Sequence, residues 1–161
     1  MTAGLLPSTA MYQRILIPTD GSSDAIKGAR QGVALAADLD ATVHSLYVIT
    51  ESGNPWESTS MDDQEERAKV YGREIVDEVG ELAEEAGVEF VSAVRFGTKV
   101  FEEINDYVEE ADIDLIVMGS GYHGEFGGLL GSTADKVVRT AHVPVMTLRR
   151  ELREGADEGV P

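Results

Sequence analysis

The sequence contains no cysteine, and this absence removes several kinds of chemistry at once. A chain without cysteine forms no disulfides, has no thiolate nucleophile and offers no sulfur ligand to zinc. Basic residues are also scarce, because 13 lysines and arginines stand against 30 aspartates and glutamates and give a net charge of −17. Such a surface repels the phosphates of nucleic acids and of anionic membranes, so we expect neither as a partner.

Long apolar runs are missing as well. No segment approaches the roughly 18 consecutive apolar residues that a membrane-spanning helix needs. The N-terminal segment, residues 1–12, lacks the basic start and the apolar stretch of a secretory signal, and we interpret it as a flexible leader. We therefore expect a cytoplasmic protein.

The shortage of lysine suggests a particular environment. Only four of the basic residues are lysines. An acidic, lysine-poor surface around an ordinary apolar core favours a halophilic cytoplasm, where counterions screen charge repulsion within about 3 Å at 1 M salt. An acidic protein from a low-salt cytoplasm is the alternative.

With 161 residues, 42% of them apolar, the chain is long enough for one domain with a full core. Five β-branched apolar runs alternate with four amphipathic helical patterns, and this order predicts an α/β fold with a doubly wound parallel sheet. The runs are residues 14–20, 42–50, 89–97, 114–120 and 143–149, and the helical patterns are residues 22–40, 61–87, 98–112 and 132–142. We assign the domain to residues 13–149, with a polar loop within 51–67 and an acidic tail at 150–161.

A glycine-rich run follows the fourth strand and contains a literal G-x-G-x-x-G at residues 119–124. A dinucleotide fingerprint requires a helix that starts at its third glycine and an acidic residue about 20 positions later. Residues 125–131 read EFGGLLG, which is too rich in glycine to start a helix, and the next strand is followed by arginines. We interpret this match as coincidental.

The end of the same run predicts a phosphate site of another kind. Gly131, Ser132 and Thr133 immediately precede the last helical pattern, where free N–H groups and the helix dipole favour an anion. The upstream glycines, Gly119 and Gly121, would let the chain fold over the same anion. The alternative is equally open at this point: the glycines make turns only, and Ser132 is an ordinary N-cap.

These segments together resemble the universal stress protein family. The resemblance is carried by IPTDGS at the first strand, LYVIT at the second, DLIVMGS at the fourth, the G-S-T before the last helix, and VPVMTLR, so it spans about residues 13–149. It implies a five-stranded sheet of order 3-2-1-4-5 flanked by four helices. That order would place the first and fourth strands side by side.

The ATP-binding branch of this family implies a role for each matching residue. Pro18, Thr19 and Asp20 match positions near adenine and ribose, and Val48 matches an adenine-lining position. Met118 and Gly119 match the end of the fourth strand, while Gly121, Gly131, Ser132 and Thr133 match the glycine motif around the phosphates. The family motif is written G-x2-G-x9-G-S/T, and this chain has one residue fewer between its first two glycines. Either Gly121 takes the second glycine's place in a tighter turn, or Gly124 does so.

The resemblance also implies an ATP-binding homodimer that pairs through its last strand, whose apolar edge carries no blocking lysine. No catalytic residue is expected, because Ser132 has no evident histidine partner and Asp20 has no second carboxylate at a fixed spacing, so Mg²⁺ would arrive only with ATP. The predicted function is a nucleotide-dependent stress-response module and not an enzyme. The alternatives are a nucleotide-free interaction dimer and a slow ATP hydrolase.

Overall fold

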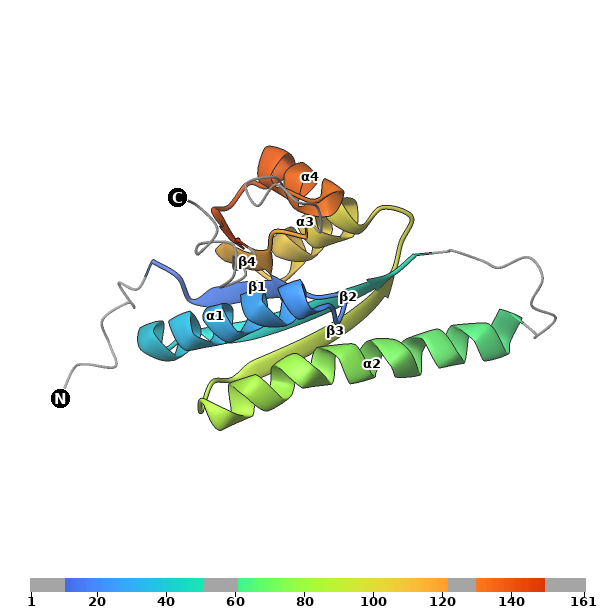
Figure 1. Ribbon diagram of the computed structural model, residues 1–161, viewed down its shortest axis with the longest axis horizontal. Helices are drawn as coiled ribbons and strands as arrows, with labels where there is room; N and C mark the ends of the chain where they lie inside the picture. The colour runs from blue at the N-terminus through green and yellow to red at the C-terminus, as the bar shows by residue number, and fades with distance from the viewer. Residues whose placement is uncertain (1–10, 51–60, 122–129, 150–161) are drawn as a thin grey trace, which may run out of the picture.

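The computed structural model describes residues 11–50, 61–121 and 130–149, and these form one layered α/β unit (Figure 1). Strands and helices alternate along the chain as the sequence predicts. The strands are β1 (Arg14–Pro18), β2 (Thr42–Ile49), β3 (Phe90–Phe96), β4 (Leu115–Gly119) and β5 (Val145–Leu148). The helices are α1 (Ser23–Leu39), α2 (Met61–Glu85), α3 (Val100–Glu110) and α4 (Ser132–Thr140).

All five strands are parallel and lie in the order β3-β2-β1-β4-β5, so the predicted fold class and strand order are confirmed. β1 lies at the centre, where it pairs with β2 on one side and with β4 on the other. The chain therefore winds outward from β1 in two directions. This reversal places the carboxyl ends of β1 and β4 side by side, which is where open α/β sheets bind ligands.

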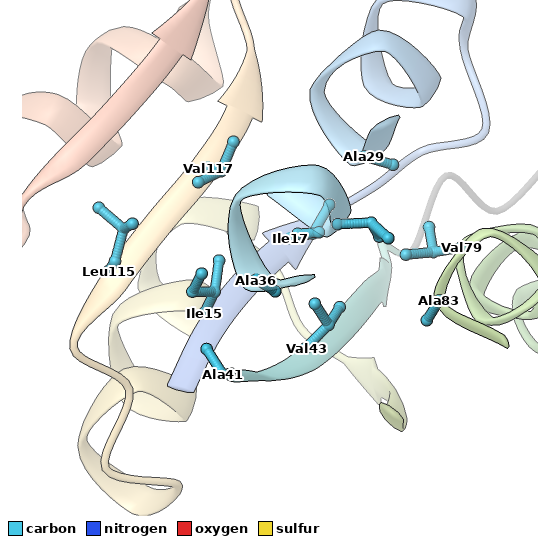
Figure 2. Close-up of a cluster of buried hydrophobic side chains, with 11 residues drawn as sticks. Ile15, Ile17, Ala29, Ala36, Ala41, Val43, Val79, Ala83, Leu115 and Val117 are labelled. Atoms are coloured by element: carbon cyan, nitrogen blue, oxygen red, sulfur yellow. The ribbon is translucent and has the colours of Figure 1, made fainter. Parts of the chain in front are cut away.

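Alternate side chains of each strand point to opposite faces of the sheet and form two separate cores. On one face, Ile15 and Ile17 of β1 pack with residues of α1 and α2, as Figure 2 shows for the buried cluster around Ala36, Val43 and Val79. On the other face, Leu16 packs with residues of α3 and α4. Both sides of β1 and β4 are buried, which explains their near-continuous apolar sequences.

The element bounds differ from the predicted ones mainly at their ends. β1 ends at Pro18, so Thr19 and Asp20 belong to the loop that follows. Helix α2 begins at Met61, as the helical pattern over residues 61–87 predicts, so the part of the polar stretch 51–67 from residue 61 onward is helix and not loop. Near its start, Asp63, Glu65 and Glu66 are exposed, which explains why this part of the helix is polar in sequence.

Several predicted features lie outside the described residues. They include most of the leader (1–10), the loop residues 51–60, Gly124 and the acidic tail (150–161). Within the described part of the chain, no helix is long and apolar enough to cross a membrane.

Candidate nucleotide-binding site

A cavity of about 210 Å³ opens at the carboxyl ends of β1, β2 and β4. All ten residues singled out from the sequence line it: Pro18, Thr19, Asp20, Val48, Met118, Gly119, Gly121, Gly131, Ser132 and Thr133. They come from segments more than a hundred positions apart, and the pairing of β1 with β4 brings them together. The cavity is also lined by Ser22, Asp24, Ala25, Leu46, Tyr47, Val100, Ile104 and Ala134.

The inner wall of the cavity is apolar. Leu46 and Val48 come from β2, Met118 from β4 and Ile104 from α3, and all are at least nine-tenths buried. A wall of this kind favours a flat apolar group such as a heterocyclic base, because contact with the wall removes both surfaces from water.

The loop after β1 is held by its own polar side chains. Thr19 Oγ1 accepts a hydrogen bond from the Gly21 N–H at 3.1 Å, and Asp20 Oδ1 accepts one from the Ser22 N–H at 2.9 Å. Ser22 then caps α1, since its Oγ accepts from the Ala25 N–H at 3.2 Å. These bonds fix the loop with Asp20 exposed at the mouth of the cavity.

The two ends of the glycine-rich run are fastened together at the end of β4. The Gly131 N–H donates to the Ser120 carbonyl at 2.7 Å, and the Ser120 N–H donates to the Leu148 carbonyl at 2.9 Å. A Cβ atom on Gly131 would lie 2.5 Å from the Gly121 carbonyl oxygen, so the close approach requires glycine. Gly121 has a φ of +70°, a conformation that glycine adopts without strain.

The N-terminus of α4 faces the cavity without a side-chain cap. Its N-cap residue is Gly131, which has no side chain, and no side-chain hydrogen bond caps the helix. Ser132 and Thr133 are the first two residues of α4, and both line the cavity. Each carries a hydroxyl group in the same helical turn as the free N–H groups. Uncapped N–H groups at the positive end of a helix dipole form a ready site for an anion. The acidic residue of this turn, Asp135, is paired with Arg139 at 3.0 Å.

Tyr47 stands between Leu46 and Val48 on β2, so its side chain points to the other face of the sheet, where its ring lies edge-on to that of Tyr71 in α2. Burial raises the pKa of the Tyr47 phenol, and the nearby Tyr71 and Asp20 raise this pKa further. The phenol therefore stays protonated at neutral pH.

Asp24 is a buried acidic residue of the cavity wall that no sequence motif singled out. It lies in the first turn of α1 and is only 7% exposed, and its Oδ2 has no hydrogen-bond partner among the described residues. An aspartate in a first helical turn is common, so its presence there carries no signal. Its position around the helix axis is informative, because Asp24 lies on the sheet-facing stripe with Ala25, Gly28 and Gly32, and an acidic side chain on that stripe is buried.

The charged side chains of the cavity wall are both carboxylates. Among the described residues, Asp20 and Asp24 line the cavity, and no lysine, arginine or histidine does. The part of the chain that the structure covers also contains no group of three or more acidic or histidine residues that could hold a metal ion by itself.

A comparison with protein-family models identifies the chain. The model described as the universal stress protein family matches residues 11–149. The chain belongs to the universal stress protein family. A universal stress protein of Methanocaldococcus jannaschii is 36% identical to it over 152 residues, which cover 89% of this chain and 86% of that protein.

Solved structures of universal stress proteins share the fold. A family member from Burkholderia pseudomallei matches with a TM-score of 0.73 and 25% identity, over 89% of this chain and 100% of that one. The universal stress protein from Archaeoglobus fulgidus in complex with dAMP matches with a TM-score of 0.63 and 21% identity, over 87% of this chain and 99% of that one. Every residue that lines the cavity of this universal stress protein falls within the segment that the family model matches.

Proposed function

We propose that this universal stress protein binds ATP in the cavity and acts as a dimeric, nucleotide-dependent regulatory or stress-response module. The observation that carries the proposal is the uncapped N-terminus of α4 at the mouth of a cavity with an apolar wall. One end of this cavity suits phosphate and the other suits a base, and a nucleotide has both in one molecule.

The adenine would lie against Val48 and Met118, and the ribose would lie near Thr19 and Asp20. The phosphates would then reach Gly131, Ser132 and Thr133, where backbone N–H groups and hydroxyls replace the lysines that the chain lacks. The fold is compatible with such a ligand, since the similar protein from Archaeoglobus fulgidus is in complex with dAMP.

A binding function fits this cavity better than catalysis. Phosphoryl transfer usually relies on a cationic side chain at the phosphates and on a residue that activates the nucleophile. No lysine, arginine or histidine of the described residues lines the cavity. We therefore expect bound ATP to dissociate intact, because its hydrolysis on the protein should take many times longer than its release.

A nucleotide-free interaction dimer is the second candidate, and the glycine motif is the observation in its favour. One residue separates Gly119 from Gly121, whereas the glycine motif of the ATP-binding branch, G-x2-G-x9-G-S/T, has two residues between its first two glycines. In this candidate the contact between Gly121 and Gly131 closes the run without leaving room for phosphates.

The dimer in both candidates would form through β5. This strand pairs only with β4 among the described strands, and Met146 on it is 38% exposed. A free edge with an exposed apolar side chain is a surface for pairing with a second copy.

Calorimetric titration with ATP, in parallel with GTP, tests the proposed function. Saturable binding of about one ATP per chain, with weaker binding of GTP, is the expected result. The absence of saturable binding of either nucleotide, both with and without Mg²⁺, would leave the nucleotide-free dimer.

A further inference from the structure

The cavity wall carries negative charge, and the proposed ligand would add more negative charge to it. Its only charged side chains among the described residues are Asp20 and Asp24, so its wall is negative. The whole chain carries a net charge of −17. A nucleotide brings further negative charge to the same place, and like charges at close range repel strongly in a partly buried site.

Asp24 has the more unusual environment of the two carboxylates. Asp20 is exposed to water, and its Oδ1 accepts a hydrogen bond from the Ser22 N–H. Asp24 is 7% exposed, and its Oδ2 has no hydrogen-bond partner in the described part of the protein. A buried carboxylate oxygen is normally hydrogen-bonded, ion-paired or bound to a cation, because an unpaired one is costly to bury.

The position of Asp24 connects it to the glycine-rich run. A Cβ atom on Gly119 would overlap the backbone carbonyl of Asp24, so the first turn of α1 packs directly on the end of β4. Asp24 therefore lies beside the residue at which the chain leaves β4 for Ser120 and Gly121. Asp24, whose Oδ2 is buried without a partner among the described residues, and the glycines proposed to bind phosphate line the same cavity.

We propose that the nucleotide binds as a complex with a hard divalent cation of the magnesium type, and that the Asp24 carboxylate is the protein ligand of this cation. The proposal rests on the proposed nucleotide-binding function. Mg²⁺ is commonly held by one or two carboxylates together with the phosphates of a substrate and several waters, and not by a cage of protein ligands. A single buried carboxylate beside a phosphate site would supply the protein ligand of such a complex, and the phosphates and waters would supply the others.

The cation would serve both partners. It would neutralise part of the phosphate charge in a cavity without basic side chains, and it would complete the coordination of Asp24 Oδ2. Because the described residues hold no cluster that could bind a metal alone, the cation would enter with the nucleotide. Binding of nucleotide and binding of cation are then coupled, and each raises the affinity for the other.

The test compares the wild type with Asp24→Asn, which keeps the size of the side chain and removes its charge. ATP affinity is measured by calorimetry with Mg²⁺ and with a chelator, at equal ionic strength. For the wild type, we expect Mg²⁺ to increase the affinity by at least about tenfold, as one close charge contact does. For Asp24→Asn, we expect the Mg²⁺-dependence to shrink to about twofold, and ATP without metal to bind more tightly than it does to the wild type.

A second measurement reports on the metal directly. Mn²⁺ replaces Mg²⁺, and the paramagnetic resonance of the Mn²⁺ complex with ATP is recorded with each protein. Protein-dependent broadening is expected for the wild type and is expected to be lost in Asp24→Asn. Asp38→Asn is the control, because Asp38 is an exposed carboxylate near the far end of the same helix, and it should behave as the wild type in both measurements.

Two results would overturn the inference while the proposed function survives. One is wild-type binding of ATP that does not depend on Mg²⁺, and the other is an equal Mg²⁺-dependence in wild type and Asp24→Asn. Failure of every protein to bind ATP under any of these conditions would instead overturn the proposed function, and the cation site with it.

Discussion

Gly131 packs backbone to backbone against Gly121, so closely that a Cβ atom on Gly131 would lie 2.5 Å from the Gly121 carbonyl oxygen. The contact fastens the end of β4 to the start of α4. It also explains why a glycine stands at the N-cap position of α4, where serine or aspartate would cap the helix better. The missing cap leaves the helix N–H groups available to a ligand.

Replacing Gly131 should therefore remove nucleotide binding. In Gly131→Val, the side chain would collide with the Gly121 carbonyl and push the two ends of the run apart, and the N–H groups of α4 would move with them. We expect ATP affinity to fall by at least about a hundredfold, the effect of losing several hydrogen bonds to an anion. Calorimetry measures the affinity, and sedimentation should show an unchanged oligomeric state. An unaltered ATP affinity in this variant would rule out α4 as the phosphate site.

Gly121 and Gly87 form a matched pair for the next prediction. Both adopt left-handed backbone, with φ of +70° and +69°, but Gly121 lines the cavity and Gly87 follows α2 with open space around it. Alanine at either position should cost about 1 kcal/mol of stability, because a Cβ disfavours this conformation. Thermal unfolding should show similar losses for Gly121→Ala and Gly87→Ala. Only Gly121→Ala should weaken ATP binding, and equal binding by the two variants would mean that Gly121 has no part in the site.

The buried pair of His44 and Tyr107 predicts a dependence of stability on pH. His44 Nδ1 lies 2.7 Å from the Tyr107 hydroxyl, and burial, together with the charge of Arg14, lowers the pKa of His44 from its ordinary value of 6.5. In the unfolded chain His44 binds a proton more readily than in the folded one. The stability that the folded protein gains from neutral His44 is therefore complete above pH 6.5, and it is lost as the pH falls below 6.5 towards the pKa of His44 in the folded state.

His44→Asn isolates this contribution, because the asparagine side chain can still bond to Tyr107 but does not titrate. Denaturant unfolding at a series of pH values from about 8 to about 5 gives the difference in free energy of unfolding between the two proteins. The wild type should lose stability relative to the variant as the pH falls. A difference that stays constant with pH would show that His44 does not titrate between the folded and unfolded states.

The two edges of the sheet allow a controlled test of the dimer. Met146 on β5 and Val91 on β3 are exposed apolar residues on opposite edge strands. A lysine on an edge strand hinders pairing with another strand, so Met146→Lys should shift the protein from dimer to monomer. Val91→Lys should not. Sedimentation velocity over a range of protein concentrations distinguishes the two, and the opposite pattern would place the interface at β3.

The sequence was sufficient for the fold and for the location of the cavity. Runs with apolar residues on both faces, such as the one that became β1, are typical of central parallel strands, and the resemblance to the family supplied the strand order. Because Thr19, Gly119 and Ser132 follow or precede such elements directly, their place at one edge of the sheet could be predicted from that order.

The helical stripe that Asp24 shares with Ala25 and Gly28 predicts that this aspartate faces the sheet, but not how deeply it is buried or that it lines the cavity. Its burial depends on how closely α1 approaches β4, and this distance depends on the small residues at their contact, Gly28 and Gly119. The contact between Gly121 and Gly131 was equally hidden, because the sequence shows their spacing but not the path of the chain between them. Both features are tertiary contacts of the backbone, which periodicity and motif spacing do not encode.

The most direct test of the account is to identify what the protein carries when it is purified without added nucleotide. The protein is denatured and removed, and the supernatant is analysed by chromatography and mass spectrometry, with Gly131→Val prepared in parallel. The account predicts nearly one ATP per chain from the wild type and almost none from the variant. A wild type that releases no nucleotide, and that also fails to bind added ATP with Mg²⁺ in high salt, would contradict it.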